Sequence, residues 1–243
     1  MNSKNTQGKI AAIHQPSFFP WLGFFDKIIR SDIFVILDNV QFPKKGGYWA
    51  NRVKIIISGK PEWLTMPIVR SYSGFRKINE MEIDNSKSWN EKTLKTIDVN
   101  YKKAPHYSDI FPELINLLES PGTDLTEFNI KIINHFCNIL NIDTSHFVKA
   151  SALNTEGHST DLLLSIIRAL NADAYMYGGG ASGYQENDKF EAAGIKLIAQ
   201  NFKQPEYPQV NTKEFVPGLS IIDVLMNCGL DSTKSMIHSA KKL

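Results

Sequence analysis

The sequence predicts an α/β fold: a mostly parallel sheet flanked by helices, with a β-hairpin excursion and a helical insertion. Two short apolar runs, residues 10–13 and 33–37, enclose a segment with apolar residues at helical spacing, which is typical of a β-α-β unit. A similar passage recurs near the C-terminus, where the runs 174–177 and 195–198 enclose a short helical segment. Because parallel strands need such crossovers, both passages indicate one parallel sheet with helices on both faces.

The segments between these two passages account for the hairpin and the helical insertion. Residues 49–57 and 62–69 are rich in β-forming residues and are joined by the turn signal at 58–61, which predicts a hairpin. Phe147 and Val148 predict a further short strand. Helices are predicted over 89–101, 110–118, 124–140, 160–170 and 219–227.

Length and composition indicate one α/β domain over residues 1–243, with residues 1–9 expected to form a disordered tail. Hydrophobic residues make up 42% of the chain and charged residues 21%, as is usual for a domain with a real core. The polar first residues lack the apolar centre of a signal peptide, and no apolar run approaches the roughly 20 residues that span a bilayer. The protein is therefore expected in the cytoplasm, without direct membrane insertion.

Charge, cysteines and histidines argue against several kinds of partner. The net charge of +2 gives no strong basic balance, so a nucleic-acid partner is not expected. Cys137 and Cys228 show no Cys-x-x-Cys spacing, which predicts free thiols. The six histidines show no metal-ligand spacing, so no metal site is predicted, and no motif identifies a cofactor.

The first candidate site segment follows the predicted strand at 10–13. Ligands of open α/β sheets bind beyond the carboxyl ends of the strands, which is where His14 and Gln15 lie. Pro16 and Pro20 stiffen the loop that follows. The His14 imidazole could serve as a general base or contact a phosphate or hydroxyl. The alternative is a structural histidine that fixes the loop through a backbone hydrogen bond.

The second candidate segment begins at Asp38, which ends the second apolar run and should face the same sheet edge as His14. Lys44 and Lys45, with the glycines after them, can present cations and backbone N–H groups to an anion such as phosphate. Arg52 offers a guanidinium fork for a phosphate or carboxylate. A solvated turn is the alternative interpretation of the lysine and glycine run.

The third candidate segment is the glycine-rich loop 178–184, which follows the apolar run 174–177. Glycines in such a loop let a ligand approach the backbone closely. The loop lacks the lysine of a phosphate-binding P-loop and the spacing of a dinucleotide fingerprint. It therefore indicates a ligand-facing loop without specifying the ligand.

Several motifs resemble those of the WbqC-like family, and together they extend from about residue 10 to residue 229. They include His14-Gln15-Pro16, Pro20-Trp21-Leu22-Gly23-Phe24-Phe25-Asp26-Lys27, Asn51-Arg52, Trp63-Leu64-Thr65, Tyr207-Pro208-Gln209 and Asp223-Val224-Leu225. The resemblance implies an enzyme of O-antigen or other surface-polysaccharide biosynthesis that modifies or transfers sugars. In one departure, Thr93 stands where the family pattern often has a histidine, which argues against a mechanism that needs a base there.

A second similarity is to nucleotidyltransferases that carry a His-x-Gly-His motif at the start of their first helix. Trp21 and Phe24 stand at the two histidine positions here, and only Gly23 matches. Because those histidines stabilise the transferring phosphate, this similarity implies a related fold rather than the same mechanism.

We expect a transferase that moves an acyl or aminoacyl group onto a nucleotide-linked or lipid-linked amino sugar. His14 would be the catalytic base, and Asp38 would orient it or bind the sugar. The alternatives are a non-catalytic scaffold that binds sugar nucleotides, and a nucleotidyltransferase-like enzyme that releases pyrophosphate. The expected partners are thus a sugar or sugar nucleotide and an acyl or aminoacyl donor.

One pocket is predicted to collect His14, Asp38, Arg52 and the loop 178–184, with tryptophans as its walls. The predicted substrate-binding residues are Gln15, Trp21, Gln41, Lys44, Lys45, Trp49, Asn51, Arg52, Gly179, Ser182 and Tyr184.

Overall fold

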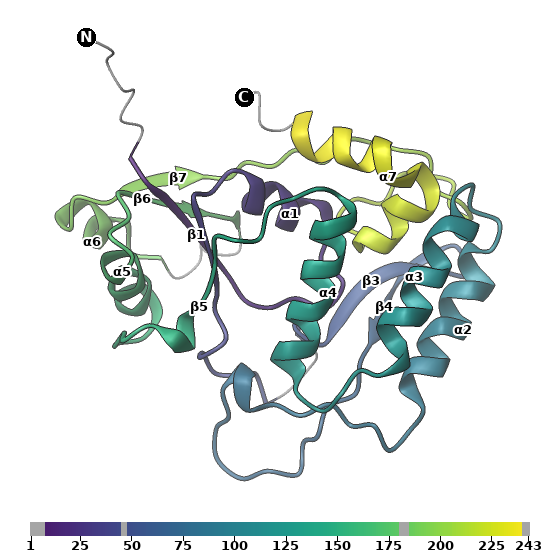
Figure 1. Ribbon diagram of the computed structural model, residues 1–243, viewed down its shortest axis with the longest axis horizontal. Coiled ribbons are helices and arrows are strands. Elements are labelled where there is room, and N and C mark those ends of the chain that lie inside the picture. Colours follow the sequence, from purple (N-terminus) through teal and green to yellow (C-terminus); the bar gives the residue numbers. More distant parts are fainter. Residues whose placement is uncertain (1–7, 45–47, 180–184, 240–243) are drawn as a thin grey trace.

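The centre of the fold is a five-stranded parallel sheet, seen in a computed structural model that describes residues 8–44, 48–179 and 185–239 (Figure 1). All neighbouring strands in it run parallel, which confirms the predicted α/β class. The strands, in their order across the sheet, are β5 (Phe147–Lys149), β2 (Ile33–Ile36), β1 (Ile10–His14), β6 (Ala174–Tyr177) and β7 (Lys196–Ala199).

The strand order reverses at the middle of the sheet. From β1 the chain moves outward to β2 and then β5, and it later returns to the other side of β1 to form β6 and β7. Counted along the chain among the parallel strands, the order is 3-2-1-4-5. In sheets of this kind, the crevice at the carboxyl ends of the two strands at the reversal is the usual ligand site. Here those two strands are β1 and β6.

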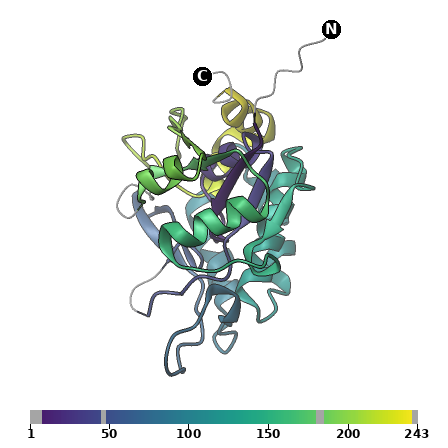
Figure 2. The same cartoon turned by 90° about the vertical axis from the view of Figure 1, so that its left-hand side faces the viewer.

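Alternate side chains of the strands enter two separate apolar cores. Ile13, Val35 and Tyr175 face a core closed by α5 (Ser159–Ala169) and α6 (Asn187–Ala192), which lie together in front of the sheet in Figure 2. Ala12 and Phe34 face the larger core on the opposite side, where α1 (Leu22–Ile29) and α4 (Leu125–Ile139) pack. This alternation explains why the strands read as continuous apolar runs: both of their faces are buried.

The predicted hairpin is formed by β3 (Arg52–Ile57) and β4 (Lys60–Thr65), which pair antiparallel outside the main sheet. Helices α2 (Trp89–Tyr101) and α3 (Tyr107–Glu119) form the helical insertion with α4, beside the hairpin (Figure 1). Short 3-10 turns, η1 (Ile78–Glu80) and η2 (Ala150–Ala152), complete this part.

The last helix, α7 (Ile221–Ser239), runs well beyond the predicted range 219–227. Its backbone is kinked at Gly229, where φ is 73° and the conformation is not helical. The first part of α7 therefore ends close to the predicted end at residue 227, and a second helical part, which was not predicted, continues from Gly229 to Ser239. The helix packs against α1, α3 and β3.

A buried hydrogen-bond network joins α7 to the hairpin and to α2, and we call it the Asp223 network. The fully buried Asp223 carboxylate accepts hydrogen bonds from Tyr101 Oη at 2.7 Å, Tyr207 Oη at 2.8 Å and Gln209 Nε2 at 3.1 Å. Tyr101 Oη in turn accepts the backbone N–H of Ile56 in β3 at 2.9 Å. Each of these polar atoms is thus satisfied where water is excluded, as stable burial requires.

The remaining features of the fold concern the cysteines, the N-terminus and the character of the helices. Cys137 and Cys228 are both free, as predicted. Residues 1–7 of the expected tail lie outside the described residues, while Lys9 donates its backbone N–H to the Asp173 carboxylate at 2.6 Å. Within the described ranges, no helix combines the length and apolar character needed to cross a membrane.

Candidate functional site

The main cavity has a volume of about 860 Å³ and opens where the strand order reverses. It is lined by His14 and Gln15 at the end of β1, by Gly178 and Gly179 after β6, and by Lys27 from α1. Its size falls within the range of roughly 300–1,000 Å³ that is typical of small-molecule sites. Its position matches the crevice at the carboxyl ends of the two strands beside the reversal.

The loop that follows β1 is held rigidly at the rim of this cavity. Asn129 on α4 donates its side-chain N–H to the carbonyl of Pro16 at 3.1 Å, and Ser220 Oγ donates to that of Phe19 at 2.9 Å. Phe19 adopts a φ of 44°, in the left-handed region that aromatic residues rarely occupy. Such a conformation persists only where the surroundings impose it, so the loop is preorganised.

The His14 ring presents a defined tautomer to the cavity. Its Nδ1 lies 2.9 Å from the Gln15 carbonyl, which can only accept, so Nδ1 carries the proton and Nε2 keeps its lone pair. The ring also packs edge-to-face on Phe24, with centroids 4.8 Å apart. Burial, and next the positive charge of Lys27, lower the pKa of His14 to about 3, against a smaller opposing effect of the Gln15 carbonyl. His14 is therefore neutral near pH 7 and accepts hydrogen bonds through Nε2.

Lys27 is a cavity residue that the sequence analysis did not single out. Its side chain is only 4% exposed, and burial lowers its pKa to about 8, partly opposed by the negative charge of Asp26. The available signal was a charged pair, Asp26 and Lys27, inside the otherwise apolar helix α1. A short helix that is buried on all sides must bury its charges too, and this marks them for attention.

One oxygen of the neighbouring Asp26 carboxylate is engaged elsewhere, while its Oδ1 is buried without a hydrogen-bond partner among the described residues. Its Oδ2 accepts hydrogen bonds from Gln200 Nε2 at 2.8 Å and Arg30 Nη1 at 3.3 Å. Burial raises the pKa of Asp26, opposed by the hydrogen bond from Gln200 and by the Arg30 charge. The Gln200 amide also donates to the carbonyl of Gly23 at 2.6 Å, so it ties the segment after β7 to α1.

Aromatic side chains form the walls of the cavity. The Trp21 indole packs edge-to-face on Phe202, with centroids 5.5 Å apart, and covers Gly23 so closely that a Cβ there would lie 2.4 Å from the ring. Trp49 is 45% exposed at the rim and contacts Trp63 edge-to-face at 5.3 Å. Flat aromatic walls with a few polar groups between them suit a ligand that has both apolar faces and polar edges, such as a sugar.

Asp38 does not line the cavity, which corrects its expected place beside His14. Its buried carboxylate accepts hydrogen bonds from the backbone N–H of Ser151 at 2.9 Å and from its hydroxyl at 2.5 Å. Ser151 follows β5, and β5 pairs with β2 on the side of the sheet away from β6. Asp38 therefore secures the outer half of the sheet edge, while the Gln15 carbonyl orients His14.

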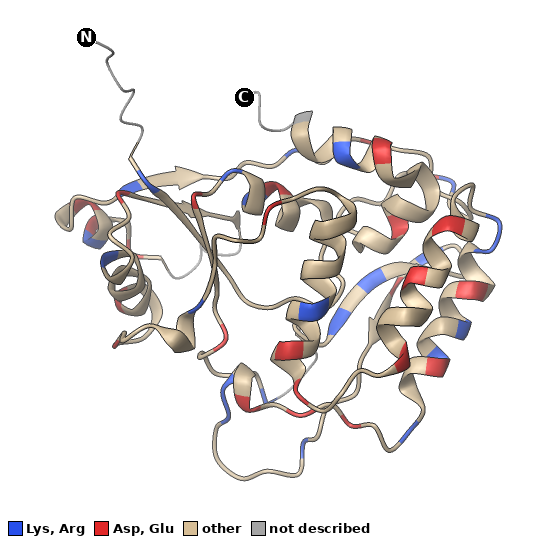
Figure 3. Ribbon diagram, in the orientation of Figure 1, with Lys and Arg blue, Asp and Glu red and all other residues tan. Residues whose placement is uncertain are grey.

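Arg52 and Asn51 also lie outside the cavity lining. The Arg52 guanidinium lies over the Trp63 ring, 4.1 Å from its centroid, on the face of β3 opposite to Val53, which does line the cavity. Figure 3 shows the basic positions along β3. Asn51 is buried and bonds only backbone groups, accepting from Tyr48 N at 3.0 Å and donating to Met66 O at 2.9 Å.

The other predicted binding residues divide into two groups. Gln41 is exposed and forms a backbone bridge with Lys77, and the Lys44 ammonium lies 5.0 Å from the centroid of the Phe75 ring, so neither lines the cavity. Predicted residues outside the described ranges are Lys45, Ser182 and Tyr184.

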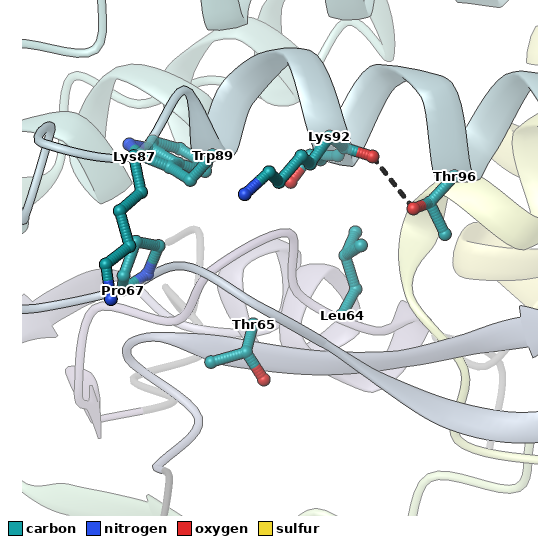
Figure 4. Close-up of a pocket in the computed structure, with 8 residues that line it drawn as sticks. Leu64, Thr65, Pro67, Lys87, Trp89, Lys92 and Thr96 are labelled. Atoms are coloured by element: carbon teal, nitrogen blue, oxygen red, sulfur yellow. Dashed lines mark hydrogen bonds between the residues drawn. The ribbon is translucent and has the colours of Figure 1, made fainter.

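A smaller pocket of about 260 Å³ lies between β4 and the start of α2 (Figure 4). Lys87 and Lys92 flank it, Trp89 and Leu64 form its walls, and Thr93 belongs to its lining. Position 93, where the family pattern often has a histidine, thus faces this pocket and not the main cavity. Across the described parts of the chain, no group of three or more histidine, cysteine or acidic residues is placed to hold a metal ion.

The comparisons agree with the motifs of the sequence. The model of the WbqC-like protein family matches residues 15–235. A protein of Mycobacterium tuberculosis described as uncharacterized, Rv1507c, is 29% identical over 226 residues, which cover 92% of this chain and 96% of that protein. No solved structure matches the chain at a significant level.

Proposed function

Because the chain belongs to the WbqC-like protein family, we propose that it is a transferase of surface-polysaccharide biosynthesis that places an acyl or aminoacyl group on an amino sugar. The sugar would be linked to a nucleotide or a lipid carrier. The observation that carries the proposal is the main cavity, which combines the neutral His14 ring, the Lys27 amine and aromatic walls at the reversal point of the sheet.

In this proposal, His14 Nε2 receives the hydrogen of the acceptor amine. A base with a pKa of about 3 does not remove a proton from a free amine at pH 7. Once the amine has attacked the acyl carbonyl, its nitrogen is positively charged and can give up a proton that the free amine would not. His14 Nε2 takes this proton and, because burial makes the His14 imidazolium strongly acidic, passes it on to the leaving group as the bond to that group breaks and the amide forms.

A nucleotidyltransferase is the second candidate, because the 3-2-1-4-5 strand order and the position of the cavity suit nucleotide binding. The residues at the motif positions weaken it. Trp21 covers Gly23, and Phe24 is 1% exposed and has no polar atom in its side chain, so neither position supplies the imidazole that stabilises a transferring phosphate in those enzymes. We therefore place acyl or aminoacyl transfer first.

The test begins with a melting-temperature screen of nucleotides, sugar nucleotides and acyl donors. A ligand present at 100 times its Kd stabilises the protein by about 2.7 kcal/mol, which such a screen detects. Binding ligands are then combined in pairs, and amide or ester products are followed by mass spectrometry. We expect His14→Ala to lower turnover by roughly 10²–10⁴-fold, the usual contribution of a positioned base.

The exposed His158 provides the matched control, since its side chain makes no cap hydrogen bond. His158→Ala should leave turnover unchanged. Pyrophosphate release from a nucleotide would favour the second candidate. Tight binding of a sugar nucleotide without any product, under every pairing, would favour the scaffold and reject the transferase.

A further inference from the structure

Lys27, which has no hydrogen-bonded counter-ion among the described residues, places a positive charge against the main cavity. Its side chain is 4% exposed, and its ammonium makes no hydrogen bond or ion pair with any residue that the structure describes. Burying an unpaired ammonium group is costly, and an ordinary core position would hold an apolar residue instead. The charge is thus retained at a cost to the fold, in a place that a ligand can reach.

The groups around Lys27 do not neutralise it. Asp26 is the carboxylate that acts on Lys27, and it is shared with the Arg30 guanidinium and the Gln200 amide. His14 on β1 also faces Lys27 and is neutral near pH 7. When Asp26 and Arg30 balance each other, one positive charge remains, and it belongs to Lys27.

The ammonium lies directly beside the backbone at the end of β6. A Cβ added at Gly178 would be 3.2 Å from Lys27 Nζ and 3.5 Å from Gln200 Oε1. The glycine therefore leaves room between the amine and the strand end, where an atom of a ligand can approach both. Gly178 does not occupy the left-handed region, so this space, and not backbone freedom, accounts for the glycine.

We propose that Lys27 binds an anionic oxygen group of the ligand, a phosphate or a carboxylate, in the space beside Gly178. The inference rests on the main cavity being the ligand site of the proposed function. It also defines the rest of the ligand. The neutral His14 ring lines the same cavity and has Nε2 as its acceptor, so we expect the ligand to carry an N–H or O–H donor as well as its anionic group. An amino sugar linked to phosphate has this pattern, and so does an aminoacyl donor with a carboxylate.

Calorimetric titration of the full chain tests this with four probes: inorganic phosphate, pyrophosphate, uridine diphosphate and acetate. The first three represent the phosphate source and acetate represents the carboxylate source. We expect one class to bind, and Lys27→Met to weaken that binding at least tenfold. Affinity should fall as the pH rises through about 8, where Lys27 loses its proton, and Lys27→Met should lack this dependence.

Two further variants make the result decisive. Gly178→Ala adds a methyl group beside the amine without backbone strain, and should also weaken anion binding. Lys196→Met removes an exposed lysine on β7 and should leave it unchanged. Unchanged affinity in Lys27→Met, or no binding of any probe to the unmodified protein, overturns the inference. Anion binding through Lys27 without any transfer product would instead reject the proposed reaction and leave this inference standing.

Discussion

Lys27 and Asp223 are both buried charged residues, but their surroundings are opposite. Asp223 is fully buried and accepts hydrogen bonds from Tyr101, Tyr207 and Gln209. Lys27 is 4% exposed, and its ammonium has no such partner among the described residues. The Asp223 network joins four segments of the chain, whereas Lys27 faces a cavity. A satisfied buried charge holds a fold together, whereas an unsatisfied one beside a cavity marks a candidate ligand site.

The motifs that carry the family resemblance fall into the same two groups: some supply satisfied interior residues and others supply cavity residues. Tyr207, Gln209 and Asp223 belong to motifs that build the interior around the Asp223 network. His14 and Lys27 belong to motifs that line the main cavity. Residues of one family pattern thus have two physical roles, and only the second group should change ligand binding directly.

The largest expected effect is the loss of the Asp223 network. Asp223→Ala leaves two buried tyrosine hydroxyls and one amide without their acceptor, so we expect destabilisation by about 3–5 kcal/mol in urea unfolding at pH 7. Asp231→Ala, at an exposed position of the same helix, should change stability by less than about 0.5 kcal/mol. A loss below 1 kcal/mol at position 223 would show that the network is not what holds α7.

Lys27→Met should change the free energy of unfolding in the opposite direction to Asp223→Ala and stabilise the protein near pH 7. The lysine pKa is about 8 in the fold against 10.5 for an exposed lysine, and each pKa unit is worth about 1.4 kcal/mol, so the gain is about 3 kcal/mol. The folded state binds the proton less tightly than the unfolded state. The cost is therefore complete below pH 8 and disappears as the pH rises from 8 to 10.5.

Urea unfolding between pH 7 and 10.5 measures this effect. The unmodified protein should gain stability relative to Lys27→Met over that range, and the two should converge at the upper end. Equal pH dependence in both proteins would mean that the ammonium is already compensated, which would remove the contrast with Asp223.

His14→Gln should produce a smaller effect in the acid range. The pKa of His14 is about 3 in the fold and near 6.5 when exposed, so the unfolded state takes up the proton first. The stability that the neutral ring provides is complete above pH 6.5 and is lost as the pH falls toward 3. Between pH 7 and 5 the unmodified protein should lose about 2 kcal/mol more than the variant, measured by urea unfolding. Parallel curves would place His14 in contact with water.

The sequence predicted the sheet and the sheet edge at which the main cavity opens because both depend on local patterns. Apolar runs of four or five residues marked β1, β2 and β6, and the rule that ligands bind beyond strand ends then placed His14 and Gly179 at the main cavity. The position of the cavity follows from the strand ends and from the parallel direction of the strands, which the intervening helices indicate.

The directions of individual side chains could not be predicted from local sequence patterns. Asp38 ends a strand at the predicted edge, yet it bonds to Ser151 because β5 is the outer neighbour of β2. Arg52 lies over Trp63 because side chains alternate along β3 and it is the next residue, Val53, that faces the cavity. A local sequence pattern does not determine which strands are neighbours in the sheet, nor the register in which they pair. Lys27 was missed because a charged residue in a helix is usually exposed.

The smallest effect concerns the corrected role of Asp38. If its carboxylate only fixes the turn after β5, removing one of its two hydrogen bonds should weaken the fold slightly and leave the cavity unchanged. Ser151→Ala deletes the hydroxyl donor at 2.5 Å and keeps the backbone N–H at 2.9 Å, so we expect a loss of about 1–2 kcal/mol in urea unfolding. Anion affinity, measured with the probe that Lys27 binds, should stay within twofold of the unmodified protein, since Asp38 does not line the cavity. A tenfold loss of affinity at unchanged stability would return Asp38 to the site and show that the outer half of the sheet edge also contacts the ligand.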